Sequence, residues 1–224
     1  MRSVSVVINA RLASSRLPRK LVKPFGGSSL IEKALDKLSR IKIDNKYLAT
    51  CDPEIIELYK PYAGCISLLE RDPRSVLKGM VPHTIAFQHY KNVPDDFILI
   101  MNPCHPFVDV LVYEAALDHF ISGTSRSLTS VVMKNNIFFD DRYTTINGTA
   151  CVEVQTHKQI PIYEMAHAFH IIDKSRFLSE GKLWGYKKDD PELFVVNKRS
   201  ALDVDDFDDF CICEALWKRA CKKD

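Results

Sequence analysis

Glycine is scarce in this chain, at 8 of 224 residues, whereas globular proteins usually carry roughly 7%. Two glycine-rich loops hold phosphates in the commonest nucleotide-binding folds, G-x-G-x-x-G and G-x-x-x-x-G-K-[ST]. Neither occurs in this sequence. A nucleotide-binding function would therefore depend on a different kind of loop.

The chain also lacks paired cysteines and long apolar runs. Its seven cysteines are an odd number without a C-x-x-C motif, which favours reduced thiols over a disulfide framework. No apolar run approaches the roughly 18 residues that a membrane-spanning helix requires, and the first residues do not form a secretory signal. We therefore expect a cytoplasmic protein without membrane insertion.

An excess of charge of either sign is absent as well. The 31 basic and 29 acidic residues nearly cancel, which leaves a net charge of +2 and argues against a general nucleic-acid-binding protein. Hydrophobic residues make up 46% of the chain, enough to form a core and to exclude intrinsic disorder. The length predicts one domain over residues 1–224.

Short β-branched and apolar runs alternate with helical patterns along the chain. Strands are expected at 4–8, 47–50, 65–69, 97–101 and 194–196. Helices are expected after Ser29, Asp52 and Asp109, and through 207–217. This alternation predicts a three-layer α/β fold with a mostly parallel sheet. The stretch from about 128 to 169 is β-rich and predicts an antiparallel extension within the domain.

The basic residues are concentrated at the beginning of the chain. Residues 1–31 contain six Arg or Lys and no Asp or Glu. Directly after the first expected strand come Arg11, Ser14, Ser15, Arg16, Arg19 and Lys20. Guanidinium groups, a lysine and small residues together suit a polyphosphate. An ordinary solvated basic loop remains the alternative.

The acidic residues have their own cluster, five aspartates within residues 203–209. Asp203 and Asp205 alternate, so on an extended segment both carboxylates face the same way. Mg²⁺ accepts one or two protein carboxylates and completes its shell with water and substrate phosphates. The alternative is that Asp205 or Asp206 caps the last helix.

Histidine and cysteine offer weaker candidates. His167 and His170 lie in the β-rich stretch, where we expect them to point to opposite sides and to serve no common site. Cys104 and His105 are adjacent, and adjacent side chains diverge on an extended chain, so they are not expected to form a nucleophile pair.

Four segments resemble one family, the cytidylyltransferases that activate acidic sugars. This group includes acylneuraminate (CMP-sialic acid) synthetases, 3-deoxy-manno-octulosonate enzymes and spore-coat polysaccharide proteins. Residues 10–20 resemble its opening motif A-R-x-x-S-x-R-x-P-x-K, and residues 203–210 resemble its ending D-[IV]-D-x-x-x-D-[FL]. Residues 50–52 and 102–107 resemble two intermediate motifs. The resemblance spans nearly the whole chain and implies a Rossmann-like fold of the nucleotide-diphospho-sugar transferase type.

The resemblance also implies an activity. The anomeric hydroxyl of an acidic, nonulosonic-acid-like 2-keto-3-deoxy sugar attacks the α-phosphorus of CTP, and pyrophosphate leaves, for surface polysaccharide biosynthesis. The implied nucleotide contacts are Ala10, Arg11, Ser14, Ser15, Arg16, Lys20, Arg71 and Asn102. The implied Mg²⁺ ligands are Asp203 and Asp205, which with Arg11 and Lys20 form the implied catalytic set. The 128–169 extension would provide acceptor contacts and a homodimer interface.

The sequence departs from the family pattern at three positions. Leu21 follows the loop lysine, as in the spore-coat branch, Cys104 stands where the octulosonate branch has aspartate, and Ser200 stands where glutamate often precedes the Asp pair. Two alternatives stay open: a nucleotidyltransferase with another NTP or a sugar phosphate acceptor, and a catalytically inactive nucleotide-binding homologue. A nucleic-acid-binding role is disfavoured, because Phe25 alone supplies no stacking surface.

Overall fold

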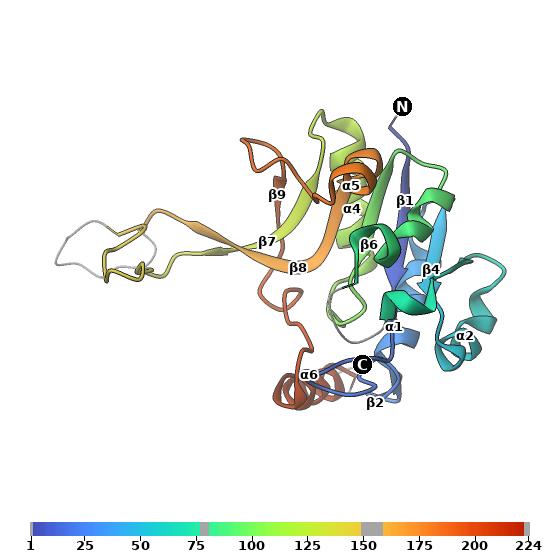
Figure 1. Ribbon diagram of the computed structural model, residues 1–224. Helices are drawn as coiled ribbons and strands as arrows, with labels where there is room; N and C mark the ends of the chain where they lie inside the picture. The colour runs from blue at the N-terminus through green and yellow to red at the C-terminus, as the bar shows by residue number, and fades with distance from the viewer. Residues whose placement is uncertain (1, 77–80, 149–158, 222–224) are drawn as a thin grey trace.

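The computed structural model describes residues 2–76, 81–148 and 159–221. Its main sheet has the strand order β5-β4-β1-β6-β8-β7-β9 (Figure 1). The strands are β1 (Val4–Asn9), β4 (Lys46–Thr50), β5 (Ser67–Glu70), β6 (Phe97–Met101), β7 (Leu128–Lys134), β8 (Ile162–Asp173) and β9 (Glu192–Val195). The first four are mutually parallel, β8 is antiparallel to β6 and β7, and β9 is parallel to β7. The prediction of a mostly parallel sheet is confirmed.

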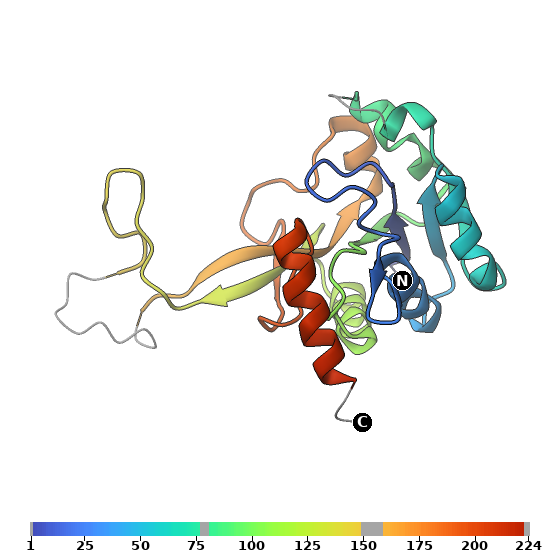
Figure 2. The ribbon, with the colours of Figure 1, turned by 90° about the horizontal axis from the view of Figure 1, so that it is seen from below.

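Helices cover both faces of this sheet (Figures 1 and 2). They are α1 (Leu30–Arg40), α2 (Pro53–Tyr59), α3 (His83–Ala86), α4 (Val110–Ser122), α5 (Lys174–Glu180) and α6 (Phe207–Ala220). Single 3-10 turns occur at η1 (Lys60–Tyr62), η2 (Pro73–Val76) and η3 (Gln88–Asn92), and a short hairpin joins β2 (Pro24–Phe25) to β3 (Ser28–Ser29). The sequence patterns predicted α1, α2, α4 and α6, but not the short α3 and α5.

Two of the helices begin with the N-cap residues that the sequence predicts, Ser29 and Asp109, and in both the cap side chain accepts a hydrogen bond from the first turn. The backbone N–H of Glu32 donates to Ser29 Oγ at the start of α1, and the N–H of Leu111 donates to Asp109 Oδ1 at the start of α4. Such caps stabilise a helix by roughly 1 kcal/mol each. Asp52 holds the N-cap position of α2, but its side chain makes no capping bond. Its Oδ2 accepts instead from the backbone N–H of Leu12, at 2.8 Å.

The core has two parts because strand side chains alternate between the sheet faces. Val6 and Ile8 of β1 belong to the larger cluster, with Leu35 of α1 and Phe120 of α4. Val7 belongs to the second cluster, whose other members include Ile98, Ile172, Tyr90 and Phe177. This two-sided burial fixes β1 and β6 in the middle of the sheet, so the segments that follow them start from rigid strands.

Strands β7 and β8 leave the body of the molecule as a long antiparallel arm (Figure 1). The expected extension at 128–169 is therefore present as an antiparallel pair, and its part at 149–158 lies outside the described residues. None of the helices in the described ranges combines the length and the apolar composition that crossing a bilayer demands.

A bulge interrupts β8 where it passes the end of β6. The register shifts between Thr129 and Val131 of β7, and His167 adopts a left-handed φ of 55°, a conformation that costs a non-glycine residue about 1–3 kcal/mol. Ser130 Oγ stabilises the bulge by donating to the carbonyl of Phe169 and accepting from its N–H. The rings of His167 and His170 lie 5.6 Å apart, so the prediction that they point to opposite sides is wrong. Strict alternation holds only in an uninterrupted strand.

Candidate active site

The basic loop that follows β1 is attached to the core and to the neighbouring strand. Ala10 is buried, and its N–H donates to the carbonyl of Ala49, so its side chain lies in the core and does not line the cavity described next. Leu17 and Leu21 are buried as well, and Asp52 holds the backbone at Leu12. The loop backbone is thereby fixed on the sheet, and Arg11, Ser15, Arg16 and Arg19 of the loop are exposed.

A cavity of 250 Å³ opens between this loop and the carboxyl end of β6. Its lining residues are Asn9, Arg11, Ala13, Ser14, Ser15, Arg16, Lys20, Leu21, Asn102, Pro103 and Cys104. Six of the eight residues expected to contact a nucleotide are therefore brought together here. Parallel sheets commonly bind ligands at this edge.

A second cavity of 360 Å³ adjoins the first and shares Asn9 and Arg11 with it. It is lined further by Arg71, Ser75, Val81, Ala86 and Phe87. Two of the expected nucleotide contacts, Ala10 and Arg71, do not line the first cavity. Ala10 is buried in the core, and Arg71 lines the second cavity. Arg71 Nε donates to Ser75 Oγ at 3.2 Å, and the residue is buried.

The acidic segment before α6 contacts the basic loop directly. Lys20 Nζ donates to the carbonyl of Val204 at 2.7 Å and to Asp205 Oδ1 at 3.3 Å, and Arg16 Nη2 donates to the same Oδ1 at 2.9 Å. Val204 is buried between the two aspartates. The last helix takes its cap from Asp206 and Asp209, which form a capping box. Asp203 and Asp205 are therefore not needed to cap it.

Asp203 has one oxygen without a partner. Among the described residues, its buried Oδ1 has no hydrogen bond, and its Oδ2 lies 3.6 Å from His105 Nε2. Burial raises the pKa of Asp203, but His105, Lys20 and His167 outweigh this effect and hold the pKa below its usual value. For Lys20, burial lowers the pKa, while Cys104, Asp205 and Asp203 more than offset it and raise the pKa. Both groups are charged at neutral pH.

These two carboxylates suit Mg²⁺. A buried carboxylate oxygen without a partner, such as Asp203 Oδ1, can accept a cation. The described part of the chain offers no cluster of three metal-ligating side chains, and Mg²⁺ does not require one when substrate phosphates complete its shell. Cys104 does not add a ligand, because burial, only partly offset by Lys20, raises the pKa of its thiol to about 11.

A polar network that no sequence pattern predicted lies beside the second cavity. Asn9 Nδ2 donates to Tyr90 Oη at 2.6 Å, and Asn9 Oδ1 lies 3.0 Å from His89 Nε2. Burial, with Arg71 adding to it, lowers the pKa of His89 to about 3, so the ring is neutral and donates its Nε2–H to Asn9. Asn9 ends β1, and this position at the edge of the sheet is the one sequence signal that could have predicted its role. His89 and Tyr90 lie in η3, which has no regular hydrophobic pattern.

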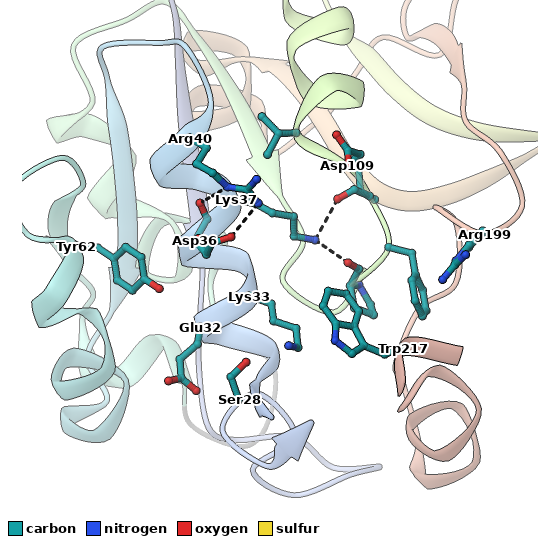
Figure 3. Close-up of a pocket in the computed structure, with 14 residues that line it drawn as sticks. Ser28, Glu32, Lys33, Asp36, Lys37, Arg40, Tyr62, Asp109, Arg199 and Trp217 are labelled. Carbon is teal, nitrogen blue, oxygen red and sulfur yellow. Dashed lines mark hydrogen bonds and ion pairs between the residues drawn. The ribbon is translucent and has the colours of Figure 1, made fainter. Parts of the chain in front are cut away.

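A larger cavity, 620 Å³, lies elsewhere, between α1, α6 and residues 106–110 (Figure 3). Its charged side chains are already engaged. Lys37 Nζ donates to the carbonyls of His105, Pro106 and Val108 at 3.0–3.1 Å, and Arg40 pairs with Asp36 at 2.8 Å. Size alone therefore does not identify the functional site, which we place at the two smaller cavities.

A mostly parallel α/β sheet whose basic first loop contacts an aspartate segment at the ligand-binding edge suits a nucleotidyltransferase. Residues 5–187 match the model of a family described as cytidylyltransferase, and the chain belongs to that family.

Curated relatives are similar over part of their length. The 3-deoxy-manno-octulosonate cytidylyltransferase of Francisella tularensis (strain FSC 198) is 29% identical over 75 residues, which cover 34% of this chain and 30% of the relative. The enzyme of the same name from Photobacterium profundum is 23% identical over 127 residues, 57% of this chain and 50% of the relative. The chain thus spans half or less of the length of the curated relatives it matches.

Solved structures share the fold over the whole chain. The 4-diphosphocytidyl-2C-methyl-D-erythritol synthase of Anaerococcus prevotii superposes with a TM-score of 0.66 at 17% identity, covering 97% of both chains. A CMP:2-keto-3-deoxy-manno-octonic acid synthetase complexed with CTP gives a TM-score of 0.65 at 12% identity, covering 99% of both chains. At these identities the likeness establishes the fold.

Proposed function

We propose that the protein is a Mg²⁺-dependent cytidylyltransferase that transfers CMP from CTP to an acidic 2-keto-3-deoxy sugar and releases pyrophosphate, for surface glycan biosynthesis. The observation that carries this proposal is the cavity in which Arg11, Arg16 and Lys20 face the segment of Asp203 and Asp205. Family membership and a CTP-complexed structural neighbour support the choice of nucleotide.

One nucleotide fits across the two adjoining cavities. The smaller one is lined by cations and serines and suits the triphosphate, which Arg11, Lys20, Ser14, Ser15 and Arg16 would hold. The 360 Å³ cavity is lined by an aromatic side chain, Phe87, and by Arg71, and it suits the base and ribose. Arg11 and Asn9 line both cavities, so they lie where ribose and phosphates would meet.

Asp203 and Asp205 would hold the Mg²⁺, which supplies charge neutralisation at the phosphates. Asp205 shares one oxygen with Arg16 and Lys20 in this structure. An incoming triphosphate competes for the same two cations and thereby frees that oxygen. The protein's own contribution is to hold the phosphates in line and to shield their charge.

The acceptor belongs on the side of Asn102 and the β8 bulge. Asn102 lines the phosphate cavity, and its Nδ2 donates to the carbonyl of His167 at 3.0 Å. An acceptor hydroxyl must approach the α-phosphorus opposite the departing pyrophosphate. Asn102, with Pro103 and Cys104, forms the part of the cavity lining that follows β6, and we assign the acceptor to this side.

A pyrophosphate-release assay tests the function. The purified chain is incubated with Mg²⁺, each of the four NTPs, and either 2-keto-3-deoxy sugar acids or sugar 1-phosphates. We expect pyrophosphate release with CTP and a sugar acid to be at least about tenfold faster than with any other NTP. A tenfold preference corresponds to about 1.4 kcal/mol of discrimination by contacts to the cytosine base. Release with another NTP or with a sugar phosphate would favour that alternative. Nucleotide binding without release under any condition would identify an inactive homologue.

The arm and β9 support the proposal of a homodimer. Met133, Tyr163, Met165, Leu193 and Val195 are each 38–51% exposed. The strand register places Tyr163 beside Met133, and places Met165 and Val195 on either side of Val131. All five side chains therefore share one face of the sheet. A contiguous apolar face of this kind is typical of a protein interface, and we propose that a second copy of the chain covers it.

Replacing Met165 by Lys is expected to convert the dimer to a monomer, because a lysine ammonium would be buried against apolar side chains without a partner. The matched control is Glu164→Gln, at the adjacent position that points to the other face. Sedimentation equilibrium at about 10 μM checks the result. A monomeric wild-type protein, or a Met165→Lys variant that still dimerises, would contradict the proposed interface.

A further inference from the structure

His105 lies in the loop after β6 with its side chain fully buried. Neither ring nitrogen has a hydrogen-bond partner among the described residues. Nε2 lies 3.6 Å from Asp203 Oδ2, which is longer than a hydrogen bond, and the other oxygen of Asp203 is also unpartnered. Buried polar atoms without partners are uncommon in native proteins. Here two such groups face each other beside the phosphate cavity.

The loop that carries His105 is held from two sides. Lys37 is buried on α1, and its Nζ donates to the carbonyls of His105, Pro106 and Val108; Figure 3 shows its side chain reaching from the helix to this loop. On the other side, the N–H of Val204 donates to the carbonyl of Cys104 at 3.0 Å. The backbone of His105 is therefore fixed relative to both α1 and the aspartate segment.

We propose that His105 is a positioning residue that orients Asp203 for the divalent cation by presenting its Nε2–H to Oδ2, which leaves Oδ1 to the cation. This role rests on the function proposed above. The geometry separates the two carboxylate oxygens, since His105 approaches Oδ2 and only Oδ1 is buried without a partner. A second hydrogen bond on a ligating group fixes its orientation, and its loss typically weakens metal affinity 10–100-fold.

The other charged and polar groups nearby do not replace His105. Lys20 is committed to Val204 and Asp205. His170 is bonded through Nδ1 to Thr129 Oγ1 at 2.8 Å. His167 lies on the bulged strand and is exposed. Among the described residues, His105 is the histidine within 4 Å of the Asp203 carboxylate.

The test uses Mn²⁺ as a probe for the cation, titrated against the full chain with CTP present and followed by electron paramagnetic resonance. His105→Leu removes the donor at similar volume, and we expect it to weaken Mn²⁺ binding 10–100-fold. His105→Gln can place an amide N–H near the position of Nε2 and should recover affinity to within about fivefold of wild type. Affinity for CTP in EDTA should change less than twofold in both variants.

The matched control is His170→Gln, at a half-buried histidine that is bonded to Thr129 and is not among the groups that shift the pKa of Asp203. Its Mn²⁺ affinity should equal that of wild type. Wild-type Mn²⁺ affinity in His105→Leu would overturn the positioning role. If His105→Leu fails to fold, a His105→Gln protein that folds yet binds Mn²⁺ 10-fold or more weakly overturns it as well. A wild-type protein that binds no Mn²⁺ with CTP would instead refute the proposed function, so the two failures are distinguishable.

Discussion

Asp203→Asn is expected to reduce turnover about 10³-fold while the protein keeps its fold. The change removes one negative charge from the pair that faces the triphosphate, and loss of one preorganised electrostatic contact typically costs 10²–10³ in rate. Asn is nearly isosteric, and Asp203 Oδ1 has no protein partner to lose among the described residues. Asp205→Asn should have an effect of the same order. Steady-state pyrophosphate release and the thermal unfolding midpoint measure the two properties.

The control for this pair is Asp208→Asn. Asp208 belongs to the same acidic cluster, but it is exposed in the first turn of α6 and does not cap the helix. Its variant should keep a rate within about twofold of wild type, as expected for a surface change. A near-normal rate in Asp203→Asn would remove this residue from the metal site, and an equal loss in Asp208→Asn would point to bulk negative charge instead.

Lys20→Ala is expected to weaken CTP binding about 10–100-fold. Lys20 is the least exposed of the cations that contact Asp205, with 15% of its side chain exposed against 65% for Arg16. A hydrogen bond from a partly buried ammonium to phosphate contributes about 1.5–3 kcal/mol, which corresponds to this range. Isothermal titration with CTP in the presence of EDTA measures the effect without the metal.

Lys23→Ala, in the same loop, serves as the comparison for Lys20→Ala. Lys23 carries the same charge but does not line either cavity, so CTP affinity should change by less than about twofold. Equal weakening in both variants would show that the loop acts through its net charge. An unchanged affinity in Lys20→Ala would exclude Lys20 from the triphosphate site.

Local signals account for what could be predicted from the sequence. The runs at Val4–Ile8 and Phe97–Met101 are β-branched or apolar, and Ser29 and Asp109 are good helix caps, so the strands and main helices could be predicted within a few residues. The meeting of the basic loop with Asp205 could be expected because both segments flank the carboxyl ends of parallel strands.

Contacts between distant segments could not be predicted in the same way. Asp52 has the position of a helix cap, yet its carboxylate holds the backbone of Leu12, 40 residues away. The bulge at His167 depends on Ser130 and Asn102 and not on any pattern within β8. Its position in the pattern of an amphipathic helix predicts that Lys37 is exposed. It is buried instead, because three carbonyls of a distant loop accept hydrogen bonds from its ammonium.

The order of the strands has a consequence for how the site is completed during synthesis. The basic loop follows β1, near the start of the chain, whereas Asp205, which it contacts, lies 185 residues after Lys20. Chains are made from the N-terminus at roughly 5–20 residues per second, so Arg16 and Lys20 emerge well before Asp205. The cation site that we propose is therefore complete only when the segment before α6 has been made.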